Sequence, residues 1–326
     1  MKTMIEKEVV LKGDVNITGT LTVPDKSSEK FPAVLLIAGS GPLDRDGNGP
    51  KGKFQLNLYK ELADFISSLG FVTFRYDKRG TGKSEGNWHE TGMWDLVEDA
   101  ERAVDFLKNE ACVDPEKIIC AGHSEGRVIA TALNEKVDLA GLMLLSGGVD
   151  NIEQALIHQR QNAYGELKSQ PGLKGWVNNK LKIDKKGEKA AAKMLNKAIN
   201  SNKDVIRYNF AKVNAKWFRE HFAFNTRESL KKVAIPVFVI HGDKDALVNS
   251  DVLLELEHLV QGKSEYHIIQ NMEHGLKEQT HEKSILKAKK LMNESIGKPL
   301  HSEAKEVMEN WLNQFKTANQ NKKILR

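Results

Sequence analysis

The feature that most constrains the fold is a serine placed between a predicted strand and a predicted helix. Residues 122–126 read Gly-His-Ser-Glu-Gly, with an apolar run at residues 118–121 before them and a helix-like segment at residues 127–133 after them. A serine at such a turn takes strained backbone angles that push its hydroxyl clear of the sheet, and the flanking glycines let strand and helix approach closely. A bare match to this pattern also occurs at ordinary tight turns. Here the strand and the helix on either side favour a nucleophile, Ser124.

Predicted strands and helices alternate along most of the chain. Apolar β-rich runs lie at residues 33–38, 71–76, 117–121, 139–145, 237–241 and 265–269, and apolar stripes at helical spacing lie at residues 58–69, 97–107, 128–132 and 304–315. Runs that are apolar on both faces predict strands covered by helices on both sides. An alternating pattern before them, at residues 9–23, predicts an antiparallel hairpin. The expected fold class is therefore α/β, with a mostly parallel central sheet flanked by helices.

The alternation is interrupted at residues 151–226, where helix formers predominate and no strand is predicted. The interruption begins just after a predicted strand, at the carboxyl end where open α/β sheets bind ligands. We therefore predict a core of residues 1–150 and 227–326 and a helical cap of residues 151–226 above the site. Aromatic side chains in a small helical layer more often pack with one another than line a pocket. The candidates for lining a pocket under this cap are Trp176, Trp217, Phe218, Phe222 and Phe224.

A serine nucleophile needs a base within hydrogen-bonding reach, and the base needs a carboxylate to orient it. The predicted strand at residues 237–241 is followed by Asp243 and Asp245, either of which could serve as the acid. We select Asp245, because Asp243 lies closer to the strand end and is typical of a residue that closes a turn. Asp243 remains the alternative.

The predicted base is His274, which lies beside a glycine in the loop after the predicted strand at residues 265–269. Three other histidines are interpreted as structural. His267 lies inside a strand and His241 at a strand end, whereas His123 is expected to pack behind the serine.

The oxyanion of an acyl-transfer intermediate needs hydrogen-bond donors, one from the residue after the nucleophile and one from the loop after the first buried strand. The backbone amide of Glu125 is the first candidate. The amide of Ser40, in the glycine-rich loop at residues 38–42, is the second.

Composition restricts the setting in which the chain works. No apolar stretch approaches the roughly 20 residues that a membrane-spanning helix requires, so we expect a soluble protein with no membrane partner. Residues 1–7 lack the apolar segment of a secretory signal, which favours a cytoplasmic location. Cys112 and Cys120 have no metal-ligand spacing and are expected to be reduced, buried thiols.

The charge pattern gives no sign of a nucleic-acid partner. The chain has 49 basic and 44 acidic residues, a net charge of +5, and these charges are interspersed along its length. Residues 180–193 and 321–326 are basic but lack the interleaved aromatic residues of a nucleic-acid surface. A solvated helix face and a frayed terminus are the expected structures.

Two motifs imitate cofactor sites. Residues 44–49 fit the first half of a calcium loop, but the twelfth position is Gln55 instead of a bidentate glutamate. Residues 79–84 resemble the end of a phosphate-binding loop, but Asp77 occupies the position of its first glycine. Neither a metal nor a nucleotide cofactor is expected.

Taken together, the motifs resemble those of the α/β-hydrolase superfamily, and more narrowly its bacterial carboxylesterases with an S9/S33-peptidase-like core. The resemblance rests on residues 39–42, 44–47, 76–84, 122–126 and 241–245 and on the His274 loop. It implies an α/β-hydrolase fold and hydrolysis of short acyl esters through an acyl-enzyme, without a cofactor. Familiar relatives have glycine after residue 126, whereas this chain has Arg127, whose cation either alters the charge of the pocket or points outward.

The leading hypothesis is thus a serine hydrolase, a carboxylesterase with the triad Ser124, Asp245 and His274 that acts on small-molecule esters. An aminopeptidase or an acyltransferase would use the same triad and differ in how the cap fits the substrate. A non-catalytic binding module on the same fold is the alternative of another class, and the intact triad argues against it.

Overall fold

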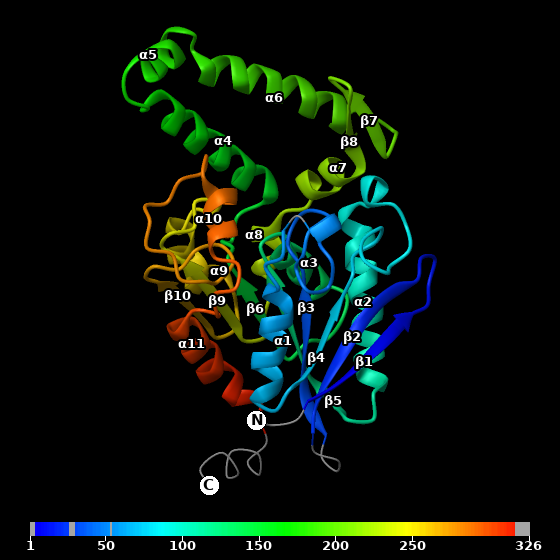
Figure 1. Ribbon diagram of the computed structural model, residues 1–326. Coiled ribbons are helices and arrows are strands. Elements are labelled where there is room, and N and C mark those ends of the chain that lie inside the picture. Colours follow the sequence, from blue (N-terminus) through cyan, green and yellow to red (C-terminus); the bar gives the residue numbers. More distant parts are fainter. Residues whose placement is uncertain (1–3, 26–29, 53, 317–326) are drawn as a thin grey trace.

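The central sheet of this computed structural model has eight strands, in the order β1-β2-β4-β3-β5-β6-β9-β10 (Figure 1). The structure describes residues 4–25, 30–52 and 54–316. The strands of the sheet are β1 (Met4–Leu11), β2 (Ile17–Pro24), β3 (Phe31–Ile37), β4 (Val72–Tyr76), β5 (Val113–His123), β6 (Gly141–Leu145), β9 (Val237–Gly242) and β10 (Ser264–Ile269).

The sheet is parallel except at one edge. β1 and β2 form an antiparallel hairpin, and β2 is antiparallel to β4. From β4 to β10 every neighbouring pair of strands is parallel. The predicted mostly parallel sheet with an initial hairpin is confirmed.

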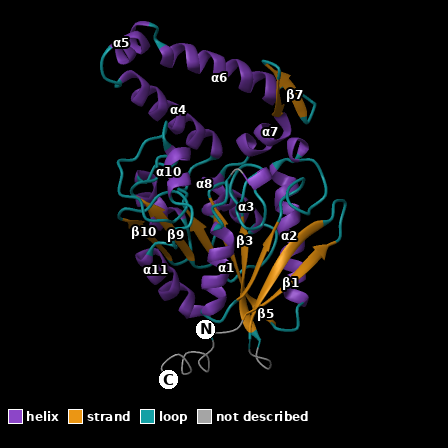
Figure 2. Cartoon of the chain, viewed as in Figure 1, coloured by secondary structure: helices purple, strands orange, loops and turns teal. Residues whose placement is uncertain are grey.

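Helices cover both faces of the sheet (Figure 2). The helices of the core are α1 (Leu58–Ser68), α2 (Met93–Asn109), α3 (Gly126–Leu133), α8 (Thr226–Leu230), α9 (Leu256–Leu259), α10 (Ala288–Glu294) and α11 (Ser302–Leu312). Short 3₁₀ turns are η1 (Pro50–Gly52), η2 (Trp88–Glu90), η3 (Asp251–Glu255) and η4 (Asn313–Phe315).

Alternate side chains of each central strand enter different apolar clusters, because successive residues of a strand point to opposite faces. In β3, Val34 and Leu36 pack with α1 and α11. Leu35 and Ile37 instead pack with α2 and α3. This two-sided burial explains why the central strands are apolar throughout and why they were recognisable in the sequence.

Strand β10 departs from this pattern. Tyr266 is 37% exposed and Ile268 is 38% exposed, although their segment was expected to be covered on both faces. β10 is an edge strand with β9 as its one neighbour, so part of its surface faces solvent.

Between β6 and β9 the chain leaves the sheet and forms an insertion above the carboxyl ends of the parallel strands (Figure 1). Its elements are α4 (Ile152–Lys168), α5 (Leu173–Lys180), α6 (Ile183–Ile199), β7 (Val205–Tyr208), β8 (Ala211–Asn214) and α7 (Ala215–Ala223). We call residues 151–226 the cap.

The prediction that the cap contains no strand is wrong. β7 and β8 form an antiparallel hairpin whose two-residue turn is Asn209 and Phe210, with φ of 47° and 64°. Positive φ at both central positions gives a turn whose twist matches that of the paired strands. The sequence carried a weak signal for this hairpin. An asparagine lies in the turn, with the β-branched residues Val205 and Ile206 before it and Val213 after it.

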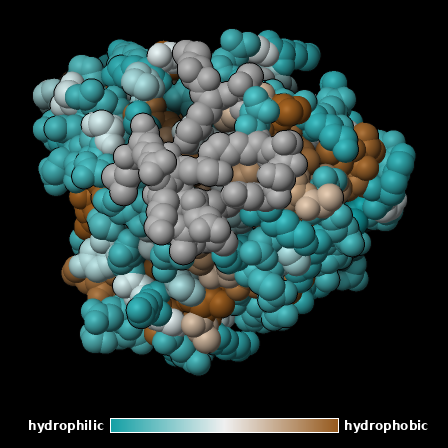
Figure 3. Space-filling model, turned by 90° about the horizontal axis from the view of Figure 1, so that it is seen from below, coloured by the Kyte–Doolittle hydropathy of each residue, from teal (hydrophilic) through white to brown (hydrophobic). Residues whose placement is uncertain are grey.

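The end of the molecule opposite the cap is seen in Figure 3. Around the residues drawn in grey, this face is mostly hydrophilic, with separate hydrophobic patches. The basic segment at residues 321–326 lies outside the described residues. Within the described part of the chain, no helix combines the length and the apolar character needed to cross a bilayer.

Candidate active site

Ser124 occupies the turn between β5 and α3, in the left-handed region with φ of 54°. The two glycines of the motif are required by the close approach of the backbone. A Cβ at Gly122 would collide with the carbonyl oxygen of Gly126, and one at Gly126 would collide with that of Ile37. Ser124 is half-buried and lines the cavity described below. The strained elbow expected from the sequence is present, and it presents the serine to a cavity.

His274 and Asp245 are held together at the same edge of the sheet. The imidazole Nδ1 lies 2.7 Å from Oδ2 of Asp245. The other carboxylate oxygen of Asp245 accepts the Leu247 amide at 2.8 Å. Because a carboxylate accepts, Nδ1 carries the proton and Nε2 is left as a base. Asp243, the alternative acid, makes no such contact; its Oδ1 is buried without a partner among the described residues.

The charges around His274 favour its protonated form. Burial opposes that form, but the Asp245 carboxylate and, more weakly, Glu273 outweigh burial and raise the pKa of His274. Burial acts on Asp245 as well, yet His274, His241 and the Leu247 amide together lower the pKa of its carboxyl group. The pair therefore combines a fixed carboxylate with a strengthened base.

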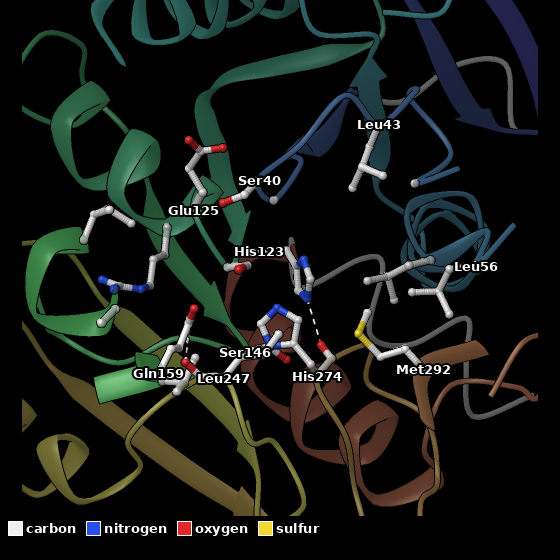
Figure 4. A pocket seen from close by; sticks show the side chains of 18 of the residues that line it. Ser40, Leu43, Leu56, His123, Glu125, Ser146, Gln159, Leu247, His274 and Met292 are labelled. Carbon is white, nitrogen blue, oxygen red and sulfur yellow. Dashed lines mark hydrogen bonds between the residues drawn. The ribbon is translucent and has the colours of Figure 1, made fainter. Parts of the chain in front are cut away.

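His123 packs against this pair, as expected from its place in the motif. Its Nδ1 lies 3.0 Å from the Tyr59 hydroxyl, and its Nε2 donates to the His274 carbonyl oxygen at 2.9 Å (Figure 4). Burial and the nearby His274 lower the pKa of His123 to about 3. A neutral His123 thus links the elbow to the backbone of His274.

A buried lysine anchors the loop that carries His274. The Lys277 side chain is fully buried, and its ammonium group donates to the Glu61 carboxylate on α1 and, at 2.6 Å, to the Lys298 carbonyl oxygen. Nothing in the sequence indicated this role, because a lysine in a polar segment is ordinarily a surface residue. Its position fixes the loop relative to α1.

The loop after β3 lies directly over the nucleophile. A Cβ at Gly39 would come within 3.1 Å of Cβ of Ser124. The Gly39 amide donates to the Tyr59 hydroxyl at 2.6 Å, and its carbonyl oxygen accepts from the Lys78 ammonium group. Because the Gly39 amide is engaged, the amides of Ser40 and Glu125, which both line the cavity, remain our candidates for the oxyanion site.

The motif that imitated a calcium loop holds this region together through ion pairs. Arg45 contacts Asp77 at 2.6 Å, and Arg75 contacts Asp46 at 2.8 Å. Gly82, from the motif that imitated a phosphate-binding loop, packs against the Asp77 carboxylate. Among the described residues, no group of three or more His, Cys, Asp or Glu side chains is placed to hold a metal ion.

The Glu125 side chain connects the elbow to the cap. It is buried, and it accepts from the Trp217 indole nitrogen of α7. His221 Nε2, also on α7, lies 3.3 Å from the same carboxylate, and Lys78 Nζ lies 3.6 Å away. Burial disfavours the charged form of Glu125, but Lys78, His221 and Trp217 outweigh burial and lower the pKa of its carboxyl group. Sequence reasoning missed this link, because its members are distant along the chain.

Ser124 and His274 line one cavity of about 410 Å³ between the core and the cap (Figure 4). This volume is typical of small-molecule sites. Most of its wall is apolar. Lining residues contributed by the core loops, α1 and α10 include Leu43, Phe54, Leu56, Leu58 and Met292, and those from the cap are Ile152, Ala155, Leu156, Gln159 and Trp217.

The five aromatic candidates for the pocket are placed differently. Phe222 and Phe224 are absent from the cavity wall and pack against a core cluster. Trp217 lines the cavity. Trp176 does not: it is 58% exposed on α5, with the Lys180 ammonium group 4.7 Å from its ring centroid. Phe218 is also absent from the cavity wall and packs with the small apolar cluster inside the cap. The prediction is therefore corrected for Trp176 and Phe218, because aromatic character alone does not say which face of a helix meets the core.

Comparisons with known proteins agree with this geometry. Residues 55–280 match the family model described as serine aminopeptidase, S33. The esterase EstD of Thermotoga maritima is 28% identical over 241 residues, which cover 74% of this chain and 52% of EstD. The chain thus spans about half the length of the curated relatives it matches.

Two solved structures show the same fold at low sequence identity. Est1E from Butyrivibrio proteoclasticus, with ferulic acid bound, superposes with a TM-score of 0.58 at 16% identity, over 94% of this chain and 97% of Est1E. DcsB in complex with its substrate analogue superposes with a TM-score of 0.60 at 16% identity, over 96% of this chain and 100% of DcsB.

Proposed function

Because the chain belongs to the serine aminopeptidase S33 family of α/β hydrolases, we propose that it is a serine hydrolase that cleaves short carboxylic esters. One observation carries the proposal. His274, bound to Asp245 at 2.7 Å, shares a cavity with a serine held at a φ of 54°. Strain of this kind persists where the surrounding structure maintains it, and it is typical of functional sites.

In the proposed reaction, Nε2 of His274 removes the proton of the Ser124 hydroxyl, and Oγ attacks the ester carbonyl carbon. The amides of Ser40 and Glu125 donate to the oxyanion that forms. When the tetrahedral intermediate collapses, the C–O bond to the alcohol breaks and His274 returns the proton to the alcohol. Water, deprotonated by His274, then attacks the acyl-enzyme and releases the acid.

The cavity supports an ester substrate over a peptide with a free amino terminus. Recognition of an ammonium group needs an anionic or acceptor-rich wall. Glu125 is the acidic residue in the wall, and its carboxylate is already engaged by Trp217 and Lys78. The relative EstD is an esterase, which points in the same direction.

A fluorophosphonate probe tests the serine directly. We expect the probe to label the wild type and not Ser124→Ala, and we expect this variant to lose at least about 10⁴-fold in kcat for 4-nitrophenyl butyrate, because removal of a triad nucleophile removes covalent catalysis. The matched control is Ser169→Ala, at the end of α4 in the cap and away from the cavity. This variant should keep both the probe labelling and the ester turnover of the wild type. Undiminished turnover by Ser124→Ala would refute the mechanism, and faster cleavage of aminoacyl 4-nitroanilides than of esters would assign an aminopeptidase.

A further inference from the structure

Arg127 is a buried cation in the wall of the active-site cavity. It lies in the first turn of α3 and lines the same cavity as Ser124 and His274. The residue is 3% exposed, and within the described part of the chain no group accepts a hydrogen bond from its guanidinium, whose NH1 is buried without a partner. Of the two orientations that the sequence left open, the inward one is observed.

Other buried arginines of this protein are paired. Arg45 contacts Asp77 at 2.6 Å, and Arg79 contacts Asp99 at 2.9 Å. The Asp150 carboxylate attracts the Arg127 guanidinium electrostatically from beyond ion-pair distance. Asp150 forms its ion pair with Arg227, at 3.8 Å. Burial lowers the pKa of Arg127 to about 10, against the opposing effect of Asp150, so the guanidinium still carries its charge at neutral pH. A buried charge without a partner is costly and calls for a ligand that supplies the partner.

A second unpartnered donor lies in the wall of the same cavity. Ser146 follows β6 with φ of 46°, lines the same cavity, and has a buried hydroxyl without a partner among the described residues. The Arg127 side chain runs against Gly147, where a Cβ would collide with it. Gly147 therefore makes room for the Arg127 side chain.

The cavity has two different sides. In Figure 4, Ser146 and Gln159 lie on one side of the two histidines, and Leu56 and Met292 lie on the other. The Arg127 side chain runs against Gly147, the residue after Ser146, and both Arg127 and Ser146 line this cavity together with its leucine and methionine side chains.

We propose that Arg127, assisted by Ser146, binds a carboxylate of the substrate, so that the preferred substrates are esters that carry a second, ionised carboxyl group. The inference rests on the proposed esterase function and names its substrate class. A guanidinium presents parallel N–H donors that match the two oxygens of a carboxylate, and such charged pairs are strong when water is excluded. The serine hydroxyl supplies a further donor to the same group.

The test compares two esters of similar length, monomethyl adipate and methyl heptanoate. We expect kcat/KM for the charged ester to exceed that for the neutral one by about 10- to 100-fold, as one desolvated, charge-assisted contact provides. Arg127→Gln should bring the ratio to about one or below. Arg207→Gln, which removes the same charge from the β7 strand of the cap outside the cavity, is the matched control and should keep the wild-type ratio. A wild type that prefers the neutral ester here and also shows no preference for a carboxylate on the alcohol side of the ester, or an Arg127→Gln variant that keeps the preference, would overturn the proposal.

A third substrate locates the carboxylate within the ester. In 6-acetoxyhexanoate the carboxylate is on the alcohol side, whereas in monomethyl adipate it is on the acyl side. An Arg127-dependent preference for either one over its neutral counterpart supports the proposal and identifies the side. Independence from Arg127 in both contradicts it.

Binding measured without turnover separates this inference from the proposed function. By calorimetry, we expect Ser124→Ala to bind adipate and Ser124→Ala/Arg127→Gln to bind it at least about 10-fold more weakly. This outcome would stand even if the fluorophosphonate left Ser124 unlabelled and no ester were cleaved. Equal adipate binding by the two variants would refute it. Thermal unfolding gives a second check: Arg127→Gln should unfold no earlier than the wild type, and a lower Tm with unchanged adipate binding would assign Arg127 to packing instead.

Discussion

The core and the cap bury their apolar side chains to very different extents. The core has two extended clusters, one on each face of the sheet, in which most members are 0–3% exposed. The cap has a cluster of Ala198, Ile206 and Ala215. Large apolar residues of the cap face solvent: Leu173, Trp176, Leu181, Ile199 and Phe210.

The cap is attached to the core by apolar packing, in which Ile152 and Leu156 join a core cluster, and by polar contacts. In α7, Trp217 donates to Glu125, and the Lys216 ammonium group lies 2.7 Å from the Asp95 carboxylate. In α4, Glu166 accepts the Ile285 amide at 2.6 Å. Rigidly packed core elements thus position Ser124, Asp245 and His274, while a loosely packed layer shapes the cavity above them. We infer that substitutions of Ser124, Asp245 and His274 change the rate of the chemical step, and that substitutions in the cap, like those of Arg127 in the cavity wall, change substrate fit.

The largest expected effect is at the core acid. Asp245→Asn should reduce kcat for 4-nitrophenyl butyrate by about 10³–10⁴-fold, because an amide no longer stabilises the imidazolium and can favour the wrong tautomer of His274. Asp243→Asn, two residues away and without contact to His274, is the matched variant and should stay within about threefold, since it lies outside the hydrogen-bonded pair. A larger loss at Asp243 would reverse the assignment of the acid.

The next largest effect is on stability, and it distinguishes an ion pair of the core from one of the cap. Glu125→Ala should lower the free energy of unfolding by about 3–5 kcal/mol, because it leaves Lys78 buried without its carboxylate. In the cap, Arg160 and Glu188 form a more exposed pair at 2.9 Å. Glu188→Ala should cost about 0–1 kcal/mol, as expected of exposed pairs. Urea unfolding of both variants measures the two losses in the free energy of unfolding. Equal losses would contradict the expected difference between core and cap.

The pH profile tests the electrostatics of the core. Because the pKa of His274 is raised, its neutral, basic form is lost as pH falls through a value above the ordinary 6.5. The kcat/KM of the wild type should therefore rise with pH and reach half of its plateau above pH 6.5. In Asp245→Asn the residual activity should reach half of its plateau at lower pH, because burial then acts with less opposition. An unchanged midpoint would show that Asp245 does not set the pKa of the base.

The smallest effect lies within the cap and compares two tryptophans. Trp217→Phe removes the donor to Glu125 at the cavity wall and should raise KM by about three- to tenfold, the loss of one hydrogen bond to a charged group. Trp176→Phe, on the exposed side of α5, should leave KM unchanged. Steady-state kinetics with a neutral short-chain ester decide between them, and an effect at Trp176 alone would return that residue to the substrate site.

The sequence predicted the core well and the cap poorly for the same physical reason. Buried strands and amphipathic helices repeat at fixed periods, so the strands of the sheet and the four longest helices of the core could be recognised locally, whereas the short helices α8, α9 and α10 were not predicted. Ser124, Asp245 and His274 could be proposed because each follows a recognisable strand. The cap buries little apolar surface, so its hairpin at residues 205–214 and the outward position of Trp176 left weak signals.

The polar residues that support the site were the least predictable. Lys78 and Glu125 meet at 3.6 Å only because β4 and β5 end at the same edge of the sheet. Lys277 and Glu61 are likewise brought together by the packing of a loop against α1. Arg127 could be noticed as a departure from a familiar glycine, yet its inward orientation depends on the space beside Gly147. Long-range contacts of this kind have no periodic signature in a single sequence.

The central claim is that the core of this molecule forms an acyl-enzyme on Ser124. Acid-quenching the wild type during turnover of 4-nitrophenyl butyrate, followed by peptide mapping, measures it directly. The account predicts the mass of a butyryl group on the peptide that contains Ser124, and none on the same peptide from Ser124→Ala. Turnover with the acyl group on another residue, or with no covalent adduct under conditions that trap one in a known serine esterase, would contradict it.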